Sequence, residues 1–140
     1  MPETTEKPLV EYATLLNTLL EAERAGARLL SAYLDELPEG SPRWRALQAV
    51  QRDEARNCSV LIHLLLEAEA TPSQDTGDFY ERGLAIRGWR ERLEFLNRGQ
   101  GWVARHLAAA LPRVPQGARR PLQAMYDSHV ANIEACEALE

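Results

Sequence analysis

The sequence predicts an all-α protein, a bundle of four long helices in which a long connection joins the second helix to the third. Over four segments, apolar residues recur in alternating steps of four and three, the spacing of one face of an α-helix. No segment alternates apolar and polar residues with a period of two, so no strand is expected. With 140 residues, of which 45% are hydrophobic and 26% charged, the chain is expected to form one globular domain spanning residues 1–140.

The first helix is expected over residues 9–37, after a polar, flexible tail at residues 1–8. Its inward positions are Leu9, Ala13, Leu16, Leu20, Glu23, Ala27, Leu30 and Leu34. All of these are Leu or Ala except Glu23. A charge in an apolar stripe is costly unless it is paired, hydrogen-bonded or bound to a metal ion. Glu23 is therefore the first candidate site residue.

The second helix is expected over residues 42–70. Ser41 is a suitable N-cap, and Pro42 suits the first helical position. The short connection before it, at residues 38–42, makes the first two helices antiparallel neighbours. The inward positions of the second helix are Leu47, Gln51, Glu54, Cys58, Leu61, Leu65 and Ala68.

The third helix is expected over residues 79–111, after the turn-rich linker TPSQDTGD at residues 71–78. Gly83 and Gly88 predict a bend near its start. Its inward positions are Ile86, Leu93, Leu96, Gln100, Val103, Leu107 and Leu111. The last helix is expected from residue 118 to the end of the chain. Its inward positions are Leu122, Met125, His129, Asn132 or Ile133, Cys136 and Leu139.

Each stripe is interrupted near its middle by a polar residue, and these are Glu23, Glu54, Gln100 and His129. Counted from the turns at a rise of ~1.5 Å per residue, their heights agree to within one turn of helix. Asn57, Asn97 and Asn132 lie one turn away on the same broad face. The sequence therefore predicts one polar layer in mid-bundle. Such a layer can be a hydrogen-bond network that sets helix register, or it can be a metal site.

Three segments carry a resemblance to a known family, namely residues 15–26 (LLNTLLEAERAG), 53–58 (DEARNC) and 128–133 (SHVANI). They resemble the ferritin-like superfamily, and most closely its small rubrerythrin-like members. That family binds two metal ions through a Glu from each of two helices and a Glu-x-x-His motif from each of the other two.

By this resemblance, Glu23 matches the glutamate of the first helix and Glu54 matches the Glu of the first Glu-x-x-His motif. Asn57 stands where the His of that motif is expected. On the third helix Gln100, or Asn97 in another register, replaces a glutamate. On the last helix, His129-x-x-Asn132 replaces the second Glu-x-x-His motif. These replacements argue against ferritin-type iron storage and against ordinary rubrerythrin peroxidase chemistry.

What the resemblance implies instead is a single Fe, Mn or Zn ion bound by Glu23, Glu54 and His129, in a protein of oxidoreductase ancestry. The surrounding amides are Gln100, Asn57, Asn97 and Asn132. A layer altered to bind a small organic ligand or a dioxygen-derived species is another interpretation. In a further alternative, no metal is bound and the chain is a non-catalytic interaction or dimerisation module.

The resemblance also gives a test of topology. In a ferritin-like path, the linker crosses the length of the bundle, the second and fourth helices are antiparallel, and Cys58 and Cys136 stay apart. In a simple up-down-up-down bundle, the two thiols reach similar heights. The interpretation favoured for both cysteines is a buried free thiol.

Charge and hydropathy exclude several classes of function. The net charge of −5 argues against nucleic acid as a partner. Neither a secretory signal nor a membrane span is visible, so a cytoplasmic location is expected. Six arginines are expected on a solvated face that pairs with acids of the first half: Arg82, Arg87, Arg90, Arg92, Arg98 and Arg105. The tryptophans are expected at the bundle ends or at a homodimer interface: Trp44, Trp89 and Trp102.

Overall fold

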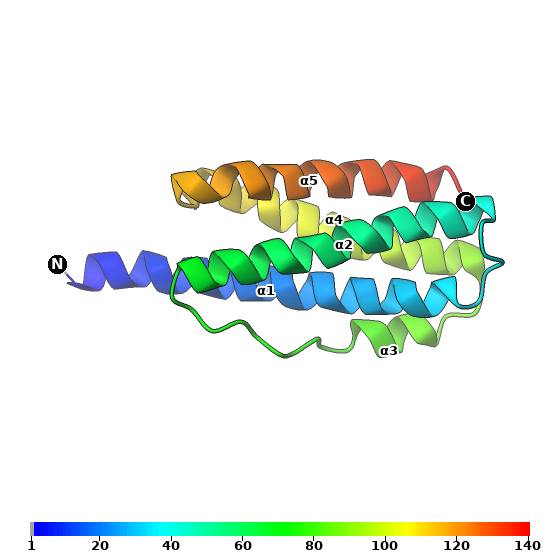
Figure 1. The fold of residues 1–140 in the computed structure, drawn as a ribbon, viewed down its shortest axis with the longest axis horizontal. Helices are drawn as coiled ribbons and strands as arrows, with labels where there is room; N and C mark the ends of the chain where they lie inside the picture. The colour runs from blue at the N-terminus through cyan, green and yellow to red at the C-terminus, as the bar shows by residue number, and fades with distance from the viewer. Residues whose placement is uncertain (1) are drawn as a thin grey trace.

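The computed structural model describes the backbone of residues 2–140 and the side chains of residues 8–140. Its helices are α1 (Pro2–Leu34), α2 (Pro42–Glu67), α3 (Phe79–Leu84), α4 (Trp89–Ala110), the 3₁₀ turn η1 (Leu111–Arg113) and α5 (Gln116–Glu137) (Figure 1). Over residues 2–140 there is no strand, so the prediction of an all-helical protein is confirmed. None of the helices in this range is both long and apolar enough to cross a membrane.

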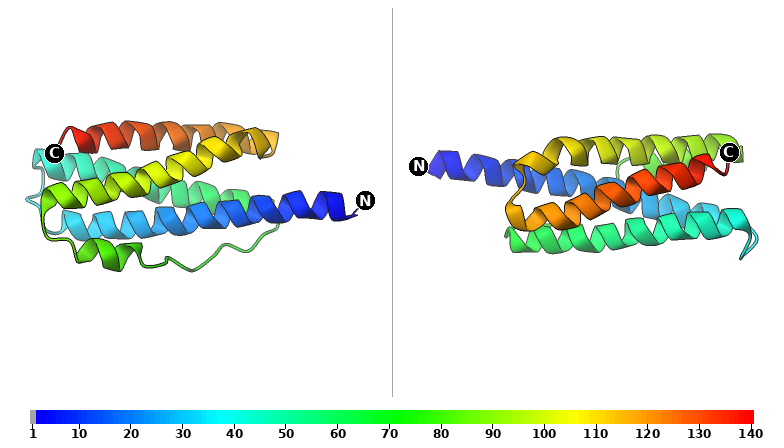
Figure 2. Two further views of the ribbon diagram at one scale, coloured as in Figure 1. Left: turned by 180° about the vertical axis from the view of Figure 1, so that it is seen from behind. Right: turned by 90° about the horizontal axis from the view of Figure 1, so that it is seen from above.

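The four long helices lie side by side, and α1 packs mainly on α2 while α4 packs mainly on α5 (Figures 1 and 2). The connection that leaves α2 runs back along α1 to α3, which also packs on α1. In consequence α2 and α4 run in the same direction, and α2 and α5 run in opposite directions (Figure 1). Cys58 and Cys136 are both free, as expected for antiparallel α2 and α5.

Side chains of α1 hold the connection between α2 and α3 in place. Asn17 donates a hydrogen bond to the Thr71 carbonyl at 3.1 Å and accepts one from the Ser73 amide at 2.7 Å. Two turns further along α1, Arg24 donates to the Asp75 carbonyl at 3.0 Å. Backbone groups of a loop need such partners when the loop lies against the protein. The connection is therefore a fixed strap along α1.

The first helix differs from the prediction at both ends. It begins at Pro2 rather than at residue 9, so residues 2–8 of the expected flexible tail are helical, and residue 1 lies outside the described residues. Pro8 lies inside this helix, where its missing N–H removes one backbone hydrogen bond. At the other end, α1 stops at Leu34, three residues before the expected end.

The expected third helix is two helices, α3 and α4, separated by residues 85–88. The predicted bend at Gly83 and Gly88 is therefore a complete break. Gly83 is the contact point with α1, because the Tyr33 hydroxyl donates to its carbonyl at 2.7 Å and the Leu29 side chain fills the space of a Cβ there. Gly88 has an extended backbone and forms the N-cap of α4.

The arginine-rich segment is only partly the solvated face that was predicted. Arg92 is buried, with 4% of its surface exposed, and its guanidinium makes two hydrogen bonds of 3.2 Å to the Glu36 carboxylate of the first half. Arg90 does lie on the surface, but it pairs with Glu94 of its own helix at 3.4 Å. Arg92 is thus a packing residue of the bundle, and the prediction that it is solvated is wrong.

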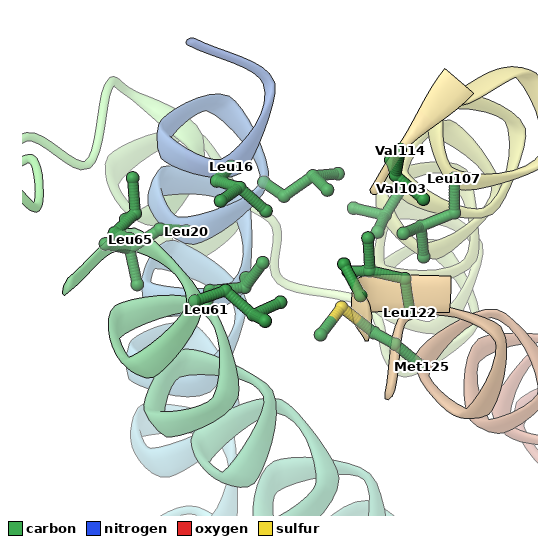
Figure 3. Packing of buried hydrophobic residues seen from close by; sticks show 12 residues of the cluster. Leu16, Leu20, Leu61, Leu65, Val103, Leu107, Val114, Leu122 and Met125 are labelled. Carbon is green, nitrogen blue, oxygen red and sulfur yellow. The ribbon is translucent and has the colours of Figure 1, made fainter. Parts of the chain in front are cut away.

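The core consists of two apolar clusters, one toward each end of the bundle. The first contains Leu16, Leu19, Leu20, Leu61, Leu64, Leu65, Val103, Leu107, Val114, Ala118, Leu122 and Met125 (Figure 3). The second contains Leu29, Leu30, Tyr33, Leu47, Val50, Leu93, Phe95, Leu96 and Cys136. On each long helix the polar residues predicted for mid-bundle fall between the members of the two clusters. The polar layer therefore separates two hydrophobic halves.

Candidate functional site

The four predicted layer positions are all buried. The exposed fractions are 1% for Glu23, 5% for Glu54, 2% for Gln100 and 1% for His129. Each comes from a different long helix, because the inward stripes of α1, α2, α4 and α5 are in phase at this height. The layer predicted from the sequence is thus present as a set of buried polar side chains.

Glu23 lies at the centre of the hydrogen bonding in this layer. Its Oε1 contacts Nε2 of His129, which joins α1 to α5. Its Oε2 accepts a hydrogen bond of 2.9 Å from Nδ2 of Asn57 on α2. Both carboxylate oxygens therefore have partners, and the orientation of Glu23 is fixed from two sides. Nδ1 of His129 has no partner among the described residues.

Glu54 lies in the same layer but is poorly satisfied. Its Oε2 is buried and has no hydrogen-bond partner among the described residues. The carboxyl group lies against Gly26 of α1, where an added Cβ would be 2.9 Å from Cδ of Glu54. Burial raises the pKa of Glu54 well above its ordinary value, and the negative charges of Glu23 and Asp53 raise it further. The folded protein therefore holds the Glu54 proton more tightly than the unfolded chain does.

A chain of amides determines how Gln100 is oriented. The Ile133 carbonyl can only accept, so the group of Asn97 that faces it at 3.3 Å is the amide nitrogen. The Asn97 oxygen then accepts from Nε2 of Gln100 at 3.2 Å, and this nitrogen also approaches Sγ of Cys136 at 3.9 Å. Oε1 of Gln100 is left buried, with no partner in the part of the chain that the structure describes. Gln100 and Asn97 therefore act together, although Asn97 is only half-buried.

Asn132 does not join Glu23 or His129. Its Nδ2 donates to Oδ2 of Asp53 at 3.1 Å, which forms a separate link between α5 and α2. Asp53 was not predicted as part of the site. The sequence feature that could have indicated Asp53 is its position directly before Glu54, at the edge of the same helix face. Ser128, beside His129, was also missed, and its hydroxyl is buried with no partner among residues 8–140.

A cavity of about 550 Å³ opens between α1 and α4 near the start of α3. Glu23, Glu54 and Gln100 line it, together with the aromatic residues Phe79, Phe95 and Trp102. His129 does not line the cavity and contacts Glu23 from the α5 side. One side of the polar layer therefore borders a cavity that is large enough for a small molecule.

The three predicted metal ligands do not form a ready coordination set. Among residues 8–140 there is no group of three or more His, Cys, Asp or Glu side chains placed to hold a metal ion. Glu23 and His129 are in contact, whereas Glu54 is linked to them only through its charge interaction with Glu23. A metal ion bound by all three would have to draw Glu54 toward the pair.

Comparison with known proteins gives one match. Residues 10–138 match the family described as a domain of unknown function, DUF6306. The chain belongs to this family. The DUF6306 match covers every position of the polar layer and the whole wall of the cavity. No curated protein and no solved structure matches the chain.

Proposed function

We propose that this DUF6306 protein is a ferritin-like helical bundle that binds one divalent transition-metal ion, Fe, Mn or Zn, in its polar layer. The observation that carries the proposal is the buried Glu54 carboxyl, which has an unpartnered oxygen in the layer that holds the Glu23–His129 pair. A buried acceptor without a partner destabilises the fold. A cation that binds Glu54 removes this penalty and also neutralises the repulsion between the two glutamates.

The path of the chain supports the ferritin-like part of the proposal. The strap along α1 makes α2 parallel to α4, which is the arrangement expected when the second connection crosses the bundle. The positions of the glutamates on α1 and α2 agree with the same resemblance, and His129 on α5 stands at the place of the second Glu-x-x-His motif. The shared feature is polar ligands projecting inward at one height from facing helices.

The donor types of the layer suit one metal ion, provided that Glu54 moves toward the Glu23–His129 pair. Glu23, Glu54 and His129 would supply two carboxylates and one imidazole, a donor set that suits Fe, Mn or Zn. Asn57 would keep Glu23 oriented by its hydrogen bond to Oε2. Such an ion, once bound, acts as a Lewis acid, and Fe or Mn can also change oxidation state. The cavity beside Glu54 would give a small molecule access to it.

The same residues do not fit two metal ions. Two cations in a carboxylate-bridged site require about four carboxylates, and the layer has only Glu23 and Glu54. Asn57 and Gln100 occupy the places of a histidine and a glutamate, and their neutral amides cannot balance a second ion. No di-iron chemistry follows from this layer.

A second candidate is a non-catalytic helical interaction module whose polar layer only sets helix register. The observation that favours it is that both oxygens of Glu23 already have protein partners, His129 and Asn57, with no metal ion involved. A network of this kind ties α1 to α2 and α5 at one height. Replacing it with apolar residues would then be neutral or stabilising.

Elemental analysis separates the two candidates. The protein is purified without chelator, reconstituted with Fe(II), Mn(II) or Zn(II), and desalted. We expect about one ion per chain, lost in Glu54→Gln and in His129→Ala. The matched control is His63→Gln, since His63 and Glu67 form an exposed pair on α2 that could bind metal nonspecifically. Absence of a stoichiometric ion after reconstitution would rule out the metal site. A triple Leu variant of Glu23, Glu54 and His129 with unchanged stability would then support the register module.

A further inference from the structure

The cavity is much larger than a metal ion requires. Its volume of about 550 Å³ lies within the range of about 300–1,000 Å³ that is typical of small-molecule sites. A water molecule, by comparison, takes up about 30 Å³ in the liquid. The cavity is therefore of a size for an organic molecule of one or two rings.

The walls of the cavity are apolar and aromatic. Phe79 at the start of α3 stacks on Phe95 of α4 with ring centroids 4.5 Å apart. Trp102 and Val103 lie two turns further along α4 and line the same space, with Ala22 of α1 among the facing residues. Aromatic side chains favour stacked or edge-on contact with another ring. This wall therefore fits an aromatic body.

One residue of the cavity wall, Gln100, has a hydrogen-bond acceptor that is not used. Only 2% of its surface is exposed, and its buried Oε1 has no partner among the side chains that the structure describes. Because Nε2 contacts Asn97 and Cys136, an O/N flip of the Gln100 amide would lose both contacts. A ligand whose donor reaches Oε1 would satisfy this buried acceptor.

The charges around the cavity exclude a negative head group. The carboxylate groups of Glu23 and Glu54 line the cavity together with Gln100. The arginines that line the cavity, Arg82 and Arg98, are exposed and lie with their guanidinium carbons 5.6 and 5.7 Å from the Phe95 ring centre. An anion next to Gln100 would therefore face two glutamates with no buried cation beside it.

We propose that this cavity binds a small aromatic molecule with one hydrogen-bond-donating head group, a hydroxyl or an amine, and no negative charge. The head group donates to Oε1 of Gln100, and the ring lies against Phe79, Phe95 and Trp102. The proposal goes beyond the metal site and does not require an ion in the layer.

Calorimetric titration of the full chain in the presence of a chelator tests the ligand class. The four probes have the same phenylalkyl skeleton and differ in the head group: 3-phenylpropan-1-ol, 3-phenylpropylamine, 3-phenylpropionate and propylbenzene. We expect the alcohol or the amine to bind at least about tenfold more tightly than propylbenzene, because only they satisfy Gln100. The tighter of these two identifies the head group. The carboxylate is expected to bind more weakly than either.

Variants then test the contact and the place. Gln100→Met removes the acceptor at similar volume, so the alcohol or amine should no longer bind with higher affinity than propylbenzene. Propylbenzene itself should still bind, which would show that the cavity is intact. Gln123→Met, at an exposed position of α5, is the matched control. Ala22→Phe fills the cavity from α1 and should abolish binding of every probe, whereas Ala124→Phe on the exposed face of α5 should not.

Three results would overturn the proposal. One is that no probe binds at concentrations up to about 10 mM, which is far above the range expected for a cavity of this size. Another is that 3-phenylpropionate binds most tightly of the four. The third is that Gln100→Met keeps the full preference for the alcohol or the amine. Because a chelator is present throughout, none of these results depends on whether the layer binds a metal ion.

Discussion

Gly26 of α1 and the Glu54 carboxyl of α2 occupy adjoining space where a larger residue on α1 would not fit. A Cβ built at Gly26 would lie 2.9 Å from Cδ of Glu54, closer than Cβ atoms approach other carbons. Glycine in mid-helix is otherwise unfavourable by about 0.5–1 kcal/mol relative to alanine. Here it lets the α2 carboxyl lie against the α1 backbone, three residues beyond Glu23.

Gly26→Ala should therefore destabilise the protein, by about 1–3 kcal/mol, because the added methyl group displaces a buried carboxyl. Urea denaturation measures the change in the free energy of unfolding. Gly117→Ala is the matched control, since nothing lies within 4 Å of an added Cβ there. Its expected effect has the opposite sign, a stabilisation of up to about 1 kcal/mol. Equal effects of the two substitutions would contradict this account of Gly26.

The protonation of Glu54 predicts a pH dependence of stability. The folded-state pKa of Glu54 is raised by burial and by Glu23 and Asp53, so the folded protein holds this proton more tightly than the unfolded chain. The stability that the bound proton contributes is fully present below the unfolded-state pKa of about 4.3. It is lost as the pH rises toward the folded-state pKa. In the presence of a chelator, the free energy of unfolding of the wild type should therefore decrease relative to that of Glu54→Gln as the pH rises above about 4.5. The decrease is at most about 1.4 kcal/mol per pH unit.

Urea denaturation at a series of pH values checks this prediction, and both proteins are measured in the same buffers. Other titrating groups are present in both proteins, so their contribution cancels to first order. Parallel stability profiles for wild type and Glu54→Gln between pH 4.5 and 8 would show that Glu54 does not hold an extra proton in the folded state.

The two cysteines should be inert in the folded protein. Burial raises the pKa of Cys58 to about 12 and that of Cys136 to about 11, and the negative charges of Glu23 and Glu54, respectively, add to this effect. At pH 8 the fraction of each cysteine present as the reactive thiolate is then on the order of one part in a thousand or less. Ellman's reagent should label two thiols per chain in guanidinium chloride and almost none in its absence. Rapid labelling of the folded protein would contradict this.

Arg92 should not be replaceable by lysine. Its guanidinium forms a two-pronged pair with Glu36, donates from Nε to the Ile86 carbonyl at 2.8 Å, and lies 4.6 Å from the ring centre of Tyr33. A lysine ammonium cannot reproduce this planar set of contacts. Arg92→Lys is expected to cost about 1–3 kcal/mol in the free energy of unfolding. Arg90→Lys, at an exposed pair, should change it by less than about 0.5 kcal/mol. Similar losses in both variants would contradict the role given to Arg92.

The periodicity of the sequence was sufficient to predict the polar layer as a place in the fold. A carboxylate, an amide or an imidazole in an apolar stripe is conspicuous, and a rise of ~1.5 Å per residue converts sequence offsets into heights. This is why the burial of Glu23, Glu54, Gln100 and His129 was predicted correctly. The partners within the layer were not predicted, because periodicity gives height but not the direction of each side chain around the helix axis.

The prediction failed where tertiary contacts outweigh local preference. Arg92 was assigned to a solvated face because arginine is mostly exposed. The break between α3 and α4 was predicted only as a bend, because the hydrogen bond from Tyr33 to the Gly83 carbonyl depends on the docking of α3 on α1. The role of Asn17 in holding residues 71–73 has no periodic signal at all, since Asn17 is simply a polar residue on a helix.

The contact between Glu23 and His129 joins residues that are 106 positions apart in the chain. It connects two helical hairpins, α1 with α2 and α4 with α5, each of which is built from neighbours in sequence. Each hairpin can form early through local contacts, with its half of the layer still in water. The buried pair requires both hairpins, so we expect their docking to be the folding step that assembles the site.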